Sequence, residues 1–389
     1  MILGAAAVAG YGETEYHKDD QREPLEYIAD AIETALDDAG LAHEDVDGLA
    51  ISSHELHSEN EITLGNHLGI SGRWFLGGVG GNAGSVVGLL RGSTAIATGQ
   101  ADVVVVAAGD ASTPESNMEM INEFNADIYK YMRPYGFGGA NGLFALLQRR
   151  HMHEYGTTRE QLGEIAITQR EHAHRNPNAI FGDDRLTMDE YLNARPIVKP
   201  LHLFDCVLPC AGGGAVVLTS REHVQTLDTD PVYLRAGDEY HNPDPLSPFS
   251  TRTPFYFHDI FGKDLTHEEI DAVQLYDNYP IWVAMQMEDL GFCEIGNAGK
   301  YVEETDLSIT GDLPLNTGGG QLSMGQANAG GGILHSIEAI RQLRGEGGDR
   351  QVSGCETVLT TGFGMVSYGG GLSSASVVFS NKTPQGGDD

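Results

Sequence analysis

A nine-residue segment occurs twice in this 389-residue chain, and this repeat limits the folds that the chain can adopt. The sequence LAHEDVDGL at 41–49 aligns with LTHEEIDAV at 265–273, at an offset of 224 residues. A looser match relates the helix end, glycine and strand of 95–106 to those of 339–359. The repeat predicts two related α/β halves, each too small to bury its own sheet.

The two halves are expected to join near residues 219–231. We place the N-terminal half at 1–225, the C-terminal half at 226–382 and a flexible tail at 383–389. An insertion at about 112–200 interrupts the first half. Because long insertions of this kind usually cover a site, we expect it to lie over one.

Hydrophobic periodicity predicts the first secondary-structure elements. Apolar residues recur on one helical face from Leu25 to Leu36, and Gly40 supplies a left-handed stop, so a helix is predicted at 24–39. The other predicted elements are a buried strand at 1–10 in place of a signal peptide, a strand at 46–51, a helix at 85–98, a strand buried on both faces at 101–108, and helices with capping boxes near Thr157 and Thr187.

The charge balance narrows the possible partners. The net charge of -33 comes from 56 acidic and 23 basic residues, and the acidic residues are spread along the whole chain. Because such a surface keeps a protein soluble in strong salt, we expect a halophilic, cytoplasmic protein. The charge disfavours binding to nucleic acids or anionic membrane surfaces, and no apolar stretch is long enough to span a bilayer.

Cysteine and histidine patterns predict no metal site. The cysteines lack metal-ligand spacing and are expected to be reduced and mostly buried; they are Cys206, Cys210, Cys293 and Cys355. Two histidine pairs are spaced i, i+2, which does not place both members on one helical face. We expect these histidines to be solvated; they are His151, His153, His172 and His174.

A series of short motifs in a fixed order resembles the thiolase superfamily over almost the whole chain. The branch it resembles contains sterol-carrier-protein thiolases, archaeal thiolase-like proteins and lipid-transfer aldolases. The motifs are GYGETEY at 10–16, VDGL at 46–49, GQAD at 99–102, RNPNA at 175–179, PLHLFDC at 200–206, QLYDNY at 274–279, EDLGFC at 288–293, LNTGGG at 315–320 and RQLRG at 341–345. This resemblance implies the thiolase fold, in which duplicated βαβ-rich halves form five αβαβα layers around a shared pocket.

Three positions depart from the residues that thiolysis uses. The family's nucleophilic Cys lies at the start of the first central helix, where this chain has Asn82. The His of the family's Gly-His-Pro motif is replaced by Gln326, which can donate a hydrogen bond but cannot carry a proton. The second catalytic Cys is replaced by Tyr368, which is followed by three glycines.

These departures favour a reaction that forms no acyl-enzyme. We expect retro-aldol cleavage of a 3-hydroxyacyl-CoA, with Tyr368 as the acid/base. Gln326 and the backbone amides near Asn82 and Gly371 would stabilise the oxyanion, and Asp277 would position water or a neighbouring group. In the aldolases that the chain resembles, a second Tyr often occupies the position of Gln326.

Two other functions remain open at this stage. A 3-oxoacyl-CoA thiolase, or acetyl-CoA acyltransferase, could use Ser85 as its nucleophile, although Ser at a helix start is more often a cap. His335 is the candidate base for that reaction, but its place within the second central helix favours packing. A non-catalytic lipid-transfer or scaffold subunit would also keep the fold.

The resemblance also implies cofactors and partners. Coenzyme A would enter as part of the acyl-CoA substrate, and no bound cofactor is expected. The family context of lipid metabolism further implies a homodimer and a separate OB-fold partner protein with a zinc ribbon.

Overall fold

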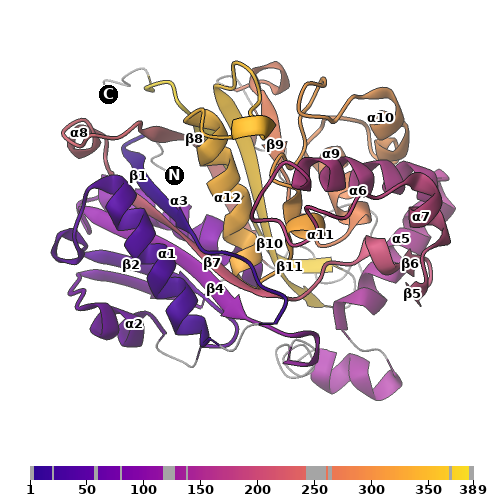
Figure 1. Cartoon of the computed structure of the whole chain (residues 1–389), viewed down its shortest axis with the longest axis horizontal. Coiled ribbons are helices and arrows are strands. Elements are labelled where there is room, and N and C mark those ends of the chain that lie inside the picture. Colours follow the sequence, from indigo (N-terminus) through magenta and orange to yellow (C-terminus); the bar gives the residue numbers. More distant parts are fainter. Residues whose placement is uncertain are drawn as a thin grey trace.

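The chain folds around one large mixed sheet (Figure 1). The computed structural model describes residues 4–19, 22–56, 60–78, 81–116, 128–136, 139–241, 260–261, 265–367 and 370–384. Within these residues the strand order is β3-β2-β4-β7-β1-β8-β11-β10-β9. The strands are β1 (Ala6–Glu13), β2 (Gly48–Ser52), β3 (Trp74–Gly77), β4 (Val103–Ala111), β7 (Ala211–Ser220), β8 (Val232–His241), β9 (Ala272–Gln274), β10 (Thr357–Ser367) and β11 (Gly370–Ser380).

The sheet has two parts, one from each half of the chain. The parts join where β1 pairs with β8 over two residue pairs, Ala7 with Tyr233 and Val8 with Val232. The sheet neighbours β3, β2, β4, β7 and β1 all precede residue 221, and β8, β11, β10 and β9 all follow it. The predicted division of the chain into two α/β halves therefore has a counterpart in the sheet.

Helices form layers on both sides of each part (Figure 1). Helix α1 (Pro24–Ala39) packs on β1, β4 and β7, while α3 (Gly84–Ala97) and α12 (Gly330–Leu343) contact strands of both parts. Helix α9 (Pro280–Asp289) lies in a separate apolar core on the other face of the C-terminal part. The result is the five-layered αβαβα arrangement that the sequence predicts.

The remaining elements are short or surround the C-terminal part. They are α2 (Asn60–Leu68), α5 (Gly139–Tyr155), α6 (Arg159–Ala173), α7 (Met188–Asn193), α8 (Arg221–Val224), α10 (Ala298–Glu304), α11 (Gly320–Met324), β5 (Pro196–Val198), β6 (Leu201–His202), a π-helical turn at Ile128–Met132, and 3-10 turns at His43–Asp45, Gly81–Ala83, Arg133–Tyr135, Leu203–Asp205, His267–Glu269 and Gly348–Arg350.

The internal repeat is confirmed at the level of single hydrogen bonds. Asp47 Oδ1 accepts bonds from the backbone N–H groups of Asp102 and Val103, at 2.8 and 3.0 Å. Its counterpart 224 residues later, Asp271, accepts from Glu356 and Thr357 at 2.8 and 2.9 Å. Each carboxylate binds the first residues of the neighbouring parallel strand, β4 or β10, so the two halves share the same hydrogen-bond arrangement.

The predicted elements agree closely with the observed ones. The helix predicted at 24–39 is α1, and Gly40 after it has a φ of +64°. The helix predicted at 85–98 is α3, and the strands predicted at 1–10, 46–51 and 101–108 are β1, β2 and β4 with shifted ends. Capping boxes are present at Thr158 and Thr187.

The expectation of four solvated histidines is wrong for two of them. His151 on α5 is fully buried, with Nε2 3.1 Å from Glu288 Oε1 on α9. His172 on α6 is also buried, with Nδ1 2.9 Å from the carbonyl of Leu315. Elements of the C-terminal half cover these helix faces, and this cover cannot be read from the spacing of the histidines. His153 and His174 are exposed.

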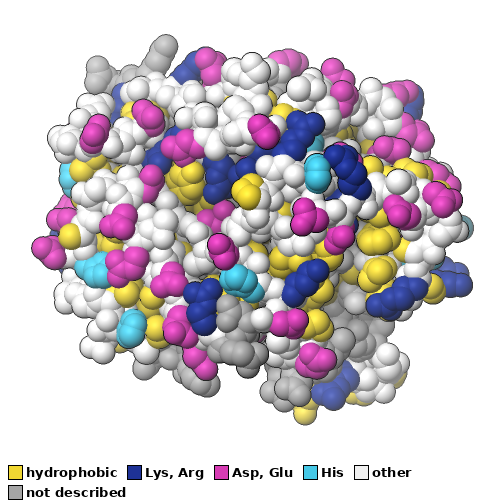
Figure 2. Space-filling view, viewed as in Figure 1, with side chains coloured by type: hydrophobic (Ala, Val, Ile, Leu, Met, Phe, Trp, Pro, Cys, Tyr) yellow, Lys and Arg dark blue, Asp and Glu magenta, His cyan; other side chains and the backbone are white. Residues whose placement is uncertain are grey.

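Acidic side chains are widespread on the face of the molecule that Figure 2 shows. Figure 2 shows Asp and Glu spread over the visible face without a single dominant patch. Across the part of the chain that the structure describes, no helix has both the length and the apolar character needed to cross a membrane.

Candidate functional site

The two central helices meet at their N-terminal ends, and a glycine permits the close approach. A Cβ atom added at Gly332 on α12 would lie 1.9 Å from the carbonyl oxygen of Asn82 and 3.0 Å from Ser85 Oγ. The contact with the Asn82 carbonyl is far shorter than a real Cβ atom can make, and the contact with Ser85 is tight, so the helices can approach this closely only because residue 332 is glycine. This contact brings Asn82 next to the segment at 326–332.

Tyr276 lies at the centre of the hydrogen bonds around this junction. Its hydroxyl accepts a bond from Asn82 Nδ2 at 2.9 Å and another from Gln326 Nε2 at 3.1 Å. The Tyr276 side chain is buried, whereas Gln326 is partly exposed and marks the side that faces solvent. The predicted site residues Asn82 and Gln326 therefore meet at Tyr276, which the sequence did not indicate as a site residue.

The surroundings of Tyr276 keep its hydroxyl protonated. Burial, and to a lesser extent the nearby Asp277 carboxylate, raise the pKa of Tyr276 well above its usual value. The amides of Gln321, Asn82 and Gln326 lower the pKa but do not outweigh burial. Because both bonds to the hydroxyl come from amide donors, the phenol can donate its own proton to a further acceptor.

The Asp277 carboxylate is bonded to groups of the protein on α11 and α12. It accepts bonds from the backbone N–H groups of Gln321 at 2.8 Å and Leu322 at 3.1 Å, and lies 3.1 Å from His335 Nε2. Gln321 Oε1 in turn accepts a bond from Gln326 Nε2 at 2.9 Å. Asp277 thus anchors the start of α11, which carries the side chain that orients Gln326.

Gln326 is also fixed through its backbone. Its N–H donates to the carbonyl of Leu208 at 2.9 Å, and its carbonyl accepts from the N–H of Cys210 at 3.1 Å. Both bonds join Gln326 to the segment around Pro209, so its backbone is held in place. Its position therefore depends on residues that are more than a hundred positions earlier in the chain.

Ser85 does not cap its helix. The residue at the N-cap position of α3 is Ala83, and Ser85 Oγ is buried with no hydrogen-bond partner among the described residues. The expectation of a capping role is therefore wrong. His335 is buried on α12, and its Nε2 lies 3.1 Å from Asp277 and 3.4 Å from Gln321 Nε2.

Tyr368 lies outside the described residues, between the end of β10 at Ser367 and the start of β11 at Gly370. The backbone of Gly371 is described and pairs with Val366 across these strands. The role of Tyr368 therefore remains a prediction from the sequence.

None of the four cysteines offers a thiolate. Burial raises the pKa of Cys206, Cys293 and Cys355 to about 12, and raises that of Cys210 further. Only the thiolate is an effective nucleophile, so these thiols are unreactive near neutral pH. Cys210 is a neighbour of Gln326 through its backbone, but its side chain is fully buried.

The sequence reasoning missed Tyr276, Gln321 and Asn328. Tyr276 directly precedes Asp277 within the QLYDNY motif at 274–279, and a Tyr at this position is a usable signal. Asn328 has a φ of +40°, and its carbonyl accepts a bond from Asn82 Nδ2 at 2.7 Å. That contact depends on the meeting of the two halves, and no local pattern indicates it.

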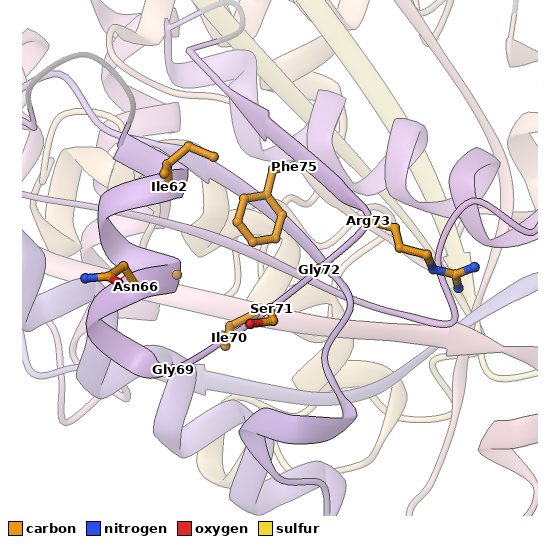
Figure 3. Close-up of a pocket in the computed structure, with 9 residues that line it drawn as sticks. Ile62, Asn66, Gly69, Ile70, Ser71, Gly72, Arg73 and Phe75 are labelled. Atoms are coloured by element: carbon orange, nitrogen blue, oxygen red, sulfur yellow. The ribbon is translucent and has the colours of Figure 1, made fainter.

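A hollow of about 500 Å³ lies elsewhere, between α2 and β3 (Figure 3). Ile62 and Phe75 line it, and Arg73 points away from the other labelled side chains. The Arg73 guanidinium is already paired with Asp47 at 2.6 Å and Asp102 at 3.0 Å. The described residues that line this hollow include no His, Cys or carboxylate side chain, so we assign the chemistry to the junction of the central helices.

Comparisons with known proteins agree with this fold. Residues 263–381 match the family model described as thiolase C-terminal domain-like. The chain is 33% identical to a steroid side-chain-cleaving aldolase of Thermomonospora curvata, over 95% of this chain and 98% of that protein. It is 32% identical to the 17-hydroxy-3-oxo-4-pregnene-20-carboxyl-CoA lyase of Mycobacterium tuberculosis, over 93% and 97%.

A solved structure is similar over nearly the full length. The Ltp2-ChsH2(DUF35) aldolase superposes with a TM-score of 0.85 at 32% identity, and the match covers 98% of both chains. The similarity therefore includes both halves of the sheet and the junction between them.

Proposed function

Because this chain belongs to the thiolase superfamily, in its branch of lipid-transfer aldolases, we propose that it cleaves a 3-hydroxyacyl-CoA between Cα and Cβ by a retro-aldol reaction. It is an acyl-CoA-processing enzyme that acts on a carbon–carbon bond. Two relatives are named for cleavage of a steroid side chain and for lysis of a steroid CoA thioester. We extend to this chain the reaction type and the CoA thioester, and leave the acyl group open.

The observation that carries the proposal is the protonated Tyr276 hydroxyl beside Asn82, the residue that stands where thiolysis would need a nucleophilic Cys. It is held by Asn82 at 2.9 Å and Gln326 at 3.1 Å, and its pKa is raised by burial. A neutral phenol is a strong hydrogen-bond donor to an oxygen on which negative charge develops. Such a site suits formation of a thioester enolate, and its described residues offer no thiolate that could accept an acyl group.

The proposed reaction needs one base and one oxyanion donor. Tyr368 removes the proton of the β-hydroxyl, the Cα–Cβ bond breaks, and the hydroxyl carbon becomes a carbonyl. The electron pair of the broken bond forms the enolate of the remaining CoA thioester, whose oxygen accepts a hydrogen bond from Tyr276. The proton taken by Tyr368 then returns to Cα, which yields the shortened acyl-CoA and a carbonyl product.

The alternative functions lack support from the described side chains. Acyl transfer through Ser85 needs a base near its hydroxyl, yet no partner is present there among the described residues, and His335 Nε2 faces Asp277. A lipid-transfer or scaffold subunit would not require the ordered amides around a buried Tyr276 hydroxyl.

We further propose that the enzyme is a cytoplasmic homodimer of a halophile and works with a separate partner protein. The similar aldolase structure carries DUF35 in its name, which supports the partner. The net charge of -33 and the spread of acidic side chains support the salt-adapted setting (Figure 2). We expect no bound cofactor beyond the coenzyme A of the substrate.

The test is an assay in high salt with 3-hydroxyacyl-CoA and 3-oxoacyl-CoA substrates, with and without the partner encoded by a neighbouring gene. We expect a shortened acyl-CoA and a carbonyl product without consumption of free CoA. Tyr276→Phe and Tyr368→Phe should each lower kcat by about 10² or more, while Ser85→Ala should not. Transfer of an acyl group to free CoA that survives Tyr368→Phe and is lost in Ser85→Ala would refute the aldolase. Binding of acyl-CoA without turnover of either substrate would favour the scaffold.

A further inference from the structure

Asn328 has an unusual backbone conformation directly behind the proposed site. Its φ of +40° lies in the left-handed region that residues with a side chain rarely adopt. The residue is almost fully buried, two positions after Gln326. Such a conformation persists only where the surrounding contacts hold it, so the contacts of Asn328 indicate what it does.

Three groups from the N-terminal half anchor this residue. The Asn328 side-chain amide donates to Ser112 Oγ and, at 3.4 Å, to Glu55 Oε1. The next backbone amide, that of Ala329, donates to Asp110 Oδ2 at 2.8 Å. Ser112 directly follows β4, Asp110 is on β4, and Glu55 belongs to the segment after β2.

The anchors are themselves firmly held. Asp110 is fully buried and accepts bonds from Ser53 Oγ at 2.5 Å and from the backbone N–H of Glu55 at 3.0 Å. Glu55 Oε2 accepts from the N–H of Ala111 at 2.8 Å, and Glu55 Oε1 accepts from the Ser112 hydroxyl. The end of β4 and the segment after β2 therefore form one hydrogen-bonded unit beneath Asn328.

The anchored residue orients the amide that holds Tyr276. The carbonyl of Asn328 accepts one N–H of Asn82 Nδ2 at 2.7 Å, and the same nitrogen donates to Tyr276 Oη at 2.9 Å. A side-chain amide has two N–H bonds in one plane. When one of them is fixed by Asn328, the direction of the other is set.

We infer that Asn328 is a positioning residue for the cleavage reaction, which aims the Asn82 amide at the Tyr276 hydroxyl because Ser112, Glu55 and Asp110 hold it in place. This inference rests on the proposed function, since Tyr276 is the group that would touch the substrate. Asn328 acts through Asn82 and does not contact the reacting atoms. The first half of the chain thereby controls a tyrosine that belongs to the second half.

Kinetics of two variants test the inference. Asn328→Gly keeps the left-handed backbone accessible but removes the side-chain anchor, and Ser112→Ala removes the acceptor of that anchor. Each should lower kcat about tenfold or more and leave KM within about threefold, because substrate binding is unaffected. Ser93→Ala is the matched control, since Ser93 is a buried hydroxyl on α3 without a hydrogen-bond partner among the described residues. The inference is overturned if both test variants keep kcat within twofold of the unmodified protein.

A double-mutant cycle separates positioning from general damage. If Asn328 acts through Asn82, then Asn328→Gly should have no further effect on kcat in a protein that already carries Asn82→Ala. A merely structural role would lower kcat by similar factors in both backgrounds. A double variant whose kcat falls by the product of the two single-variant factors would therefore contradict the inference.

A spectroscopic measurement keeps the test independent of turnover. In protein labelled with ¹³C at the tyrosine Cζ, the Tyr276 signal is identified by its loss in Tyr276→Phe. Asn328→Gly should shift this signal in the same direction as Asn82→Ala, whereas Ser93→Ala should leave it in place. If the unmodified protein fails to cleave 3-hydroxyacyl-CoA, the proposed function fails, yet this shift still decides whether Asn328 positions Asn82. An unshifted signal in Asn328→Gly overturns the inference.

Discussion

Asn316 and Asn328 have the same unusual backbone conformation but different surroundings. Their φ values are +48° and +40°, and both are buried in segments that precede helices of the C-terminal half. Asn316 binds the backbone of Leu275 twice, with Oδ1 accepting at 2.7 Å and Nδ2 donating at 2.9 Å. Asn328 binds Ser112 and Glu55, which belong to the other half.

This difference indicates that Asn316 stabilises the fold, whereas Asn328 positions a residue of the site. Asn316 completes the hydrogen bonds of a backbone segment that is fully buried, so its loss would leave an N–H and a C=O without partners. Asn328 contacts side chains that also bond one another, so its loss leaves them partly satisfied. We therefore expect the first residue to govern stability and the second to govern the rate.

The largest expected effect is the loss of stability in Asn316→Ala. Two buried backbone groups of Leu275 lose their partners, which costs about 1–3 kcal/mol each, and alanine adds strain of about 1–2 kcal/mol in the left-handed region. We expect a fall of about 4 kcal/mol in the free energy of unfolding, measured with urea in high salt. A fall of less than about 1 kcal/mol would remove the contrast between the two asparagines.

The second prediction concerns Asp110, the buried anchor on the Asn328 side. Burial raises the pKa of its carboxyl to about 7, from 3.8 in the unfolded chain, and Glu55 adds to the shift. The folded state thus binds more protons between pH 4 and 7, so stability is highest at the acid end of this window and falls as the pH rises. His54 is also close to Asp110: its backbone N–H bonds the Asp110 carboxylate, and burial lowers the pKa of its ring to about 4.

The measurement compares unfolding of the unmodified protein and Asp110→Asn at pH values from 4 to 8. The unmodified protein should lose on the order of 3 kcal/mol relative to the variant across this window and then level off. A constant difference between the two proteins would show that Asp110 does not titrate there. Near Asn316 the titratable group is His172, whose Nδ1 lies 3.3 Å from the Asn316 carbonyl and whose pKa burial lowers, which gives a pH dependence of the opposite sign. The comparison with Asp110→Asn isolates the contribution of Asp110 from that of His172.

Substitution of Gly332 is expected to have an intermediate effect on stability. A Cβ at this position would meet the Asn82 carbonyl at 1.9 Å, and backbone atoms cannot move aside as a side chain can. Gly332→Ala should cost about 2 kcal/mol and also lower kcat, because the helices that carry Asn82 and Asn328 would separate. The control is Gly92→Ala, whose Cβ would lie 3.1 Å from a Val104 methyl group and should cost less. Equal costs would argue against tight contact of the helix ends.

Much of the fold could be predicted from the sequence because its signals are local or repeated. Glycine stops, capping boxes and apolar periodicity fix the ends of α1 and α6, and the repeat identifies Asp47 and Asp271 as equivalent residues. The thiolase-like motifs also placed Asn82 and Gln326 in one site. Each of these features can be read within a short stretch of chain.

The rest of the site depends on contacts between distant segments. Tyr276 is central because the side-chain amides of Asn82 and Gln326, from other segments, both bond its hydroxyl. Ser85 does not cap α3 because the helix begins at Gly84, with Ala83 at the N-cap position. His151 was expected in solvent, yet α9 covers it. Spacing along the chain reports which face a residue occupies but not what covers that face.

The smallest expected effect compares alanine and glycine at the two asparagines. Glycine adopts a positive φ freely, so each alanine variant should be less stable than the glycine variant by about 1 kcal/mol. Because φ is nearly the same at both positions, this difference should be the same for Asn316 and Asn328. The glycine variants themselves should differ, since Asn316→Gly still leaves the Leu275 backbone without partners. Urea unfolding of the four variants gives both quantities. If the difference in unfolding free energy between the alanine and glycine variants is unequal at Asn316 and Asn328, then backbone strain, and not the hydrogen-bond partners, distinguishes the two residues.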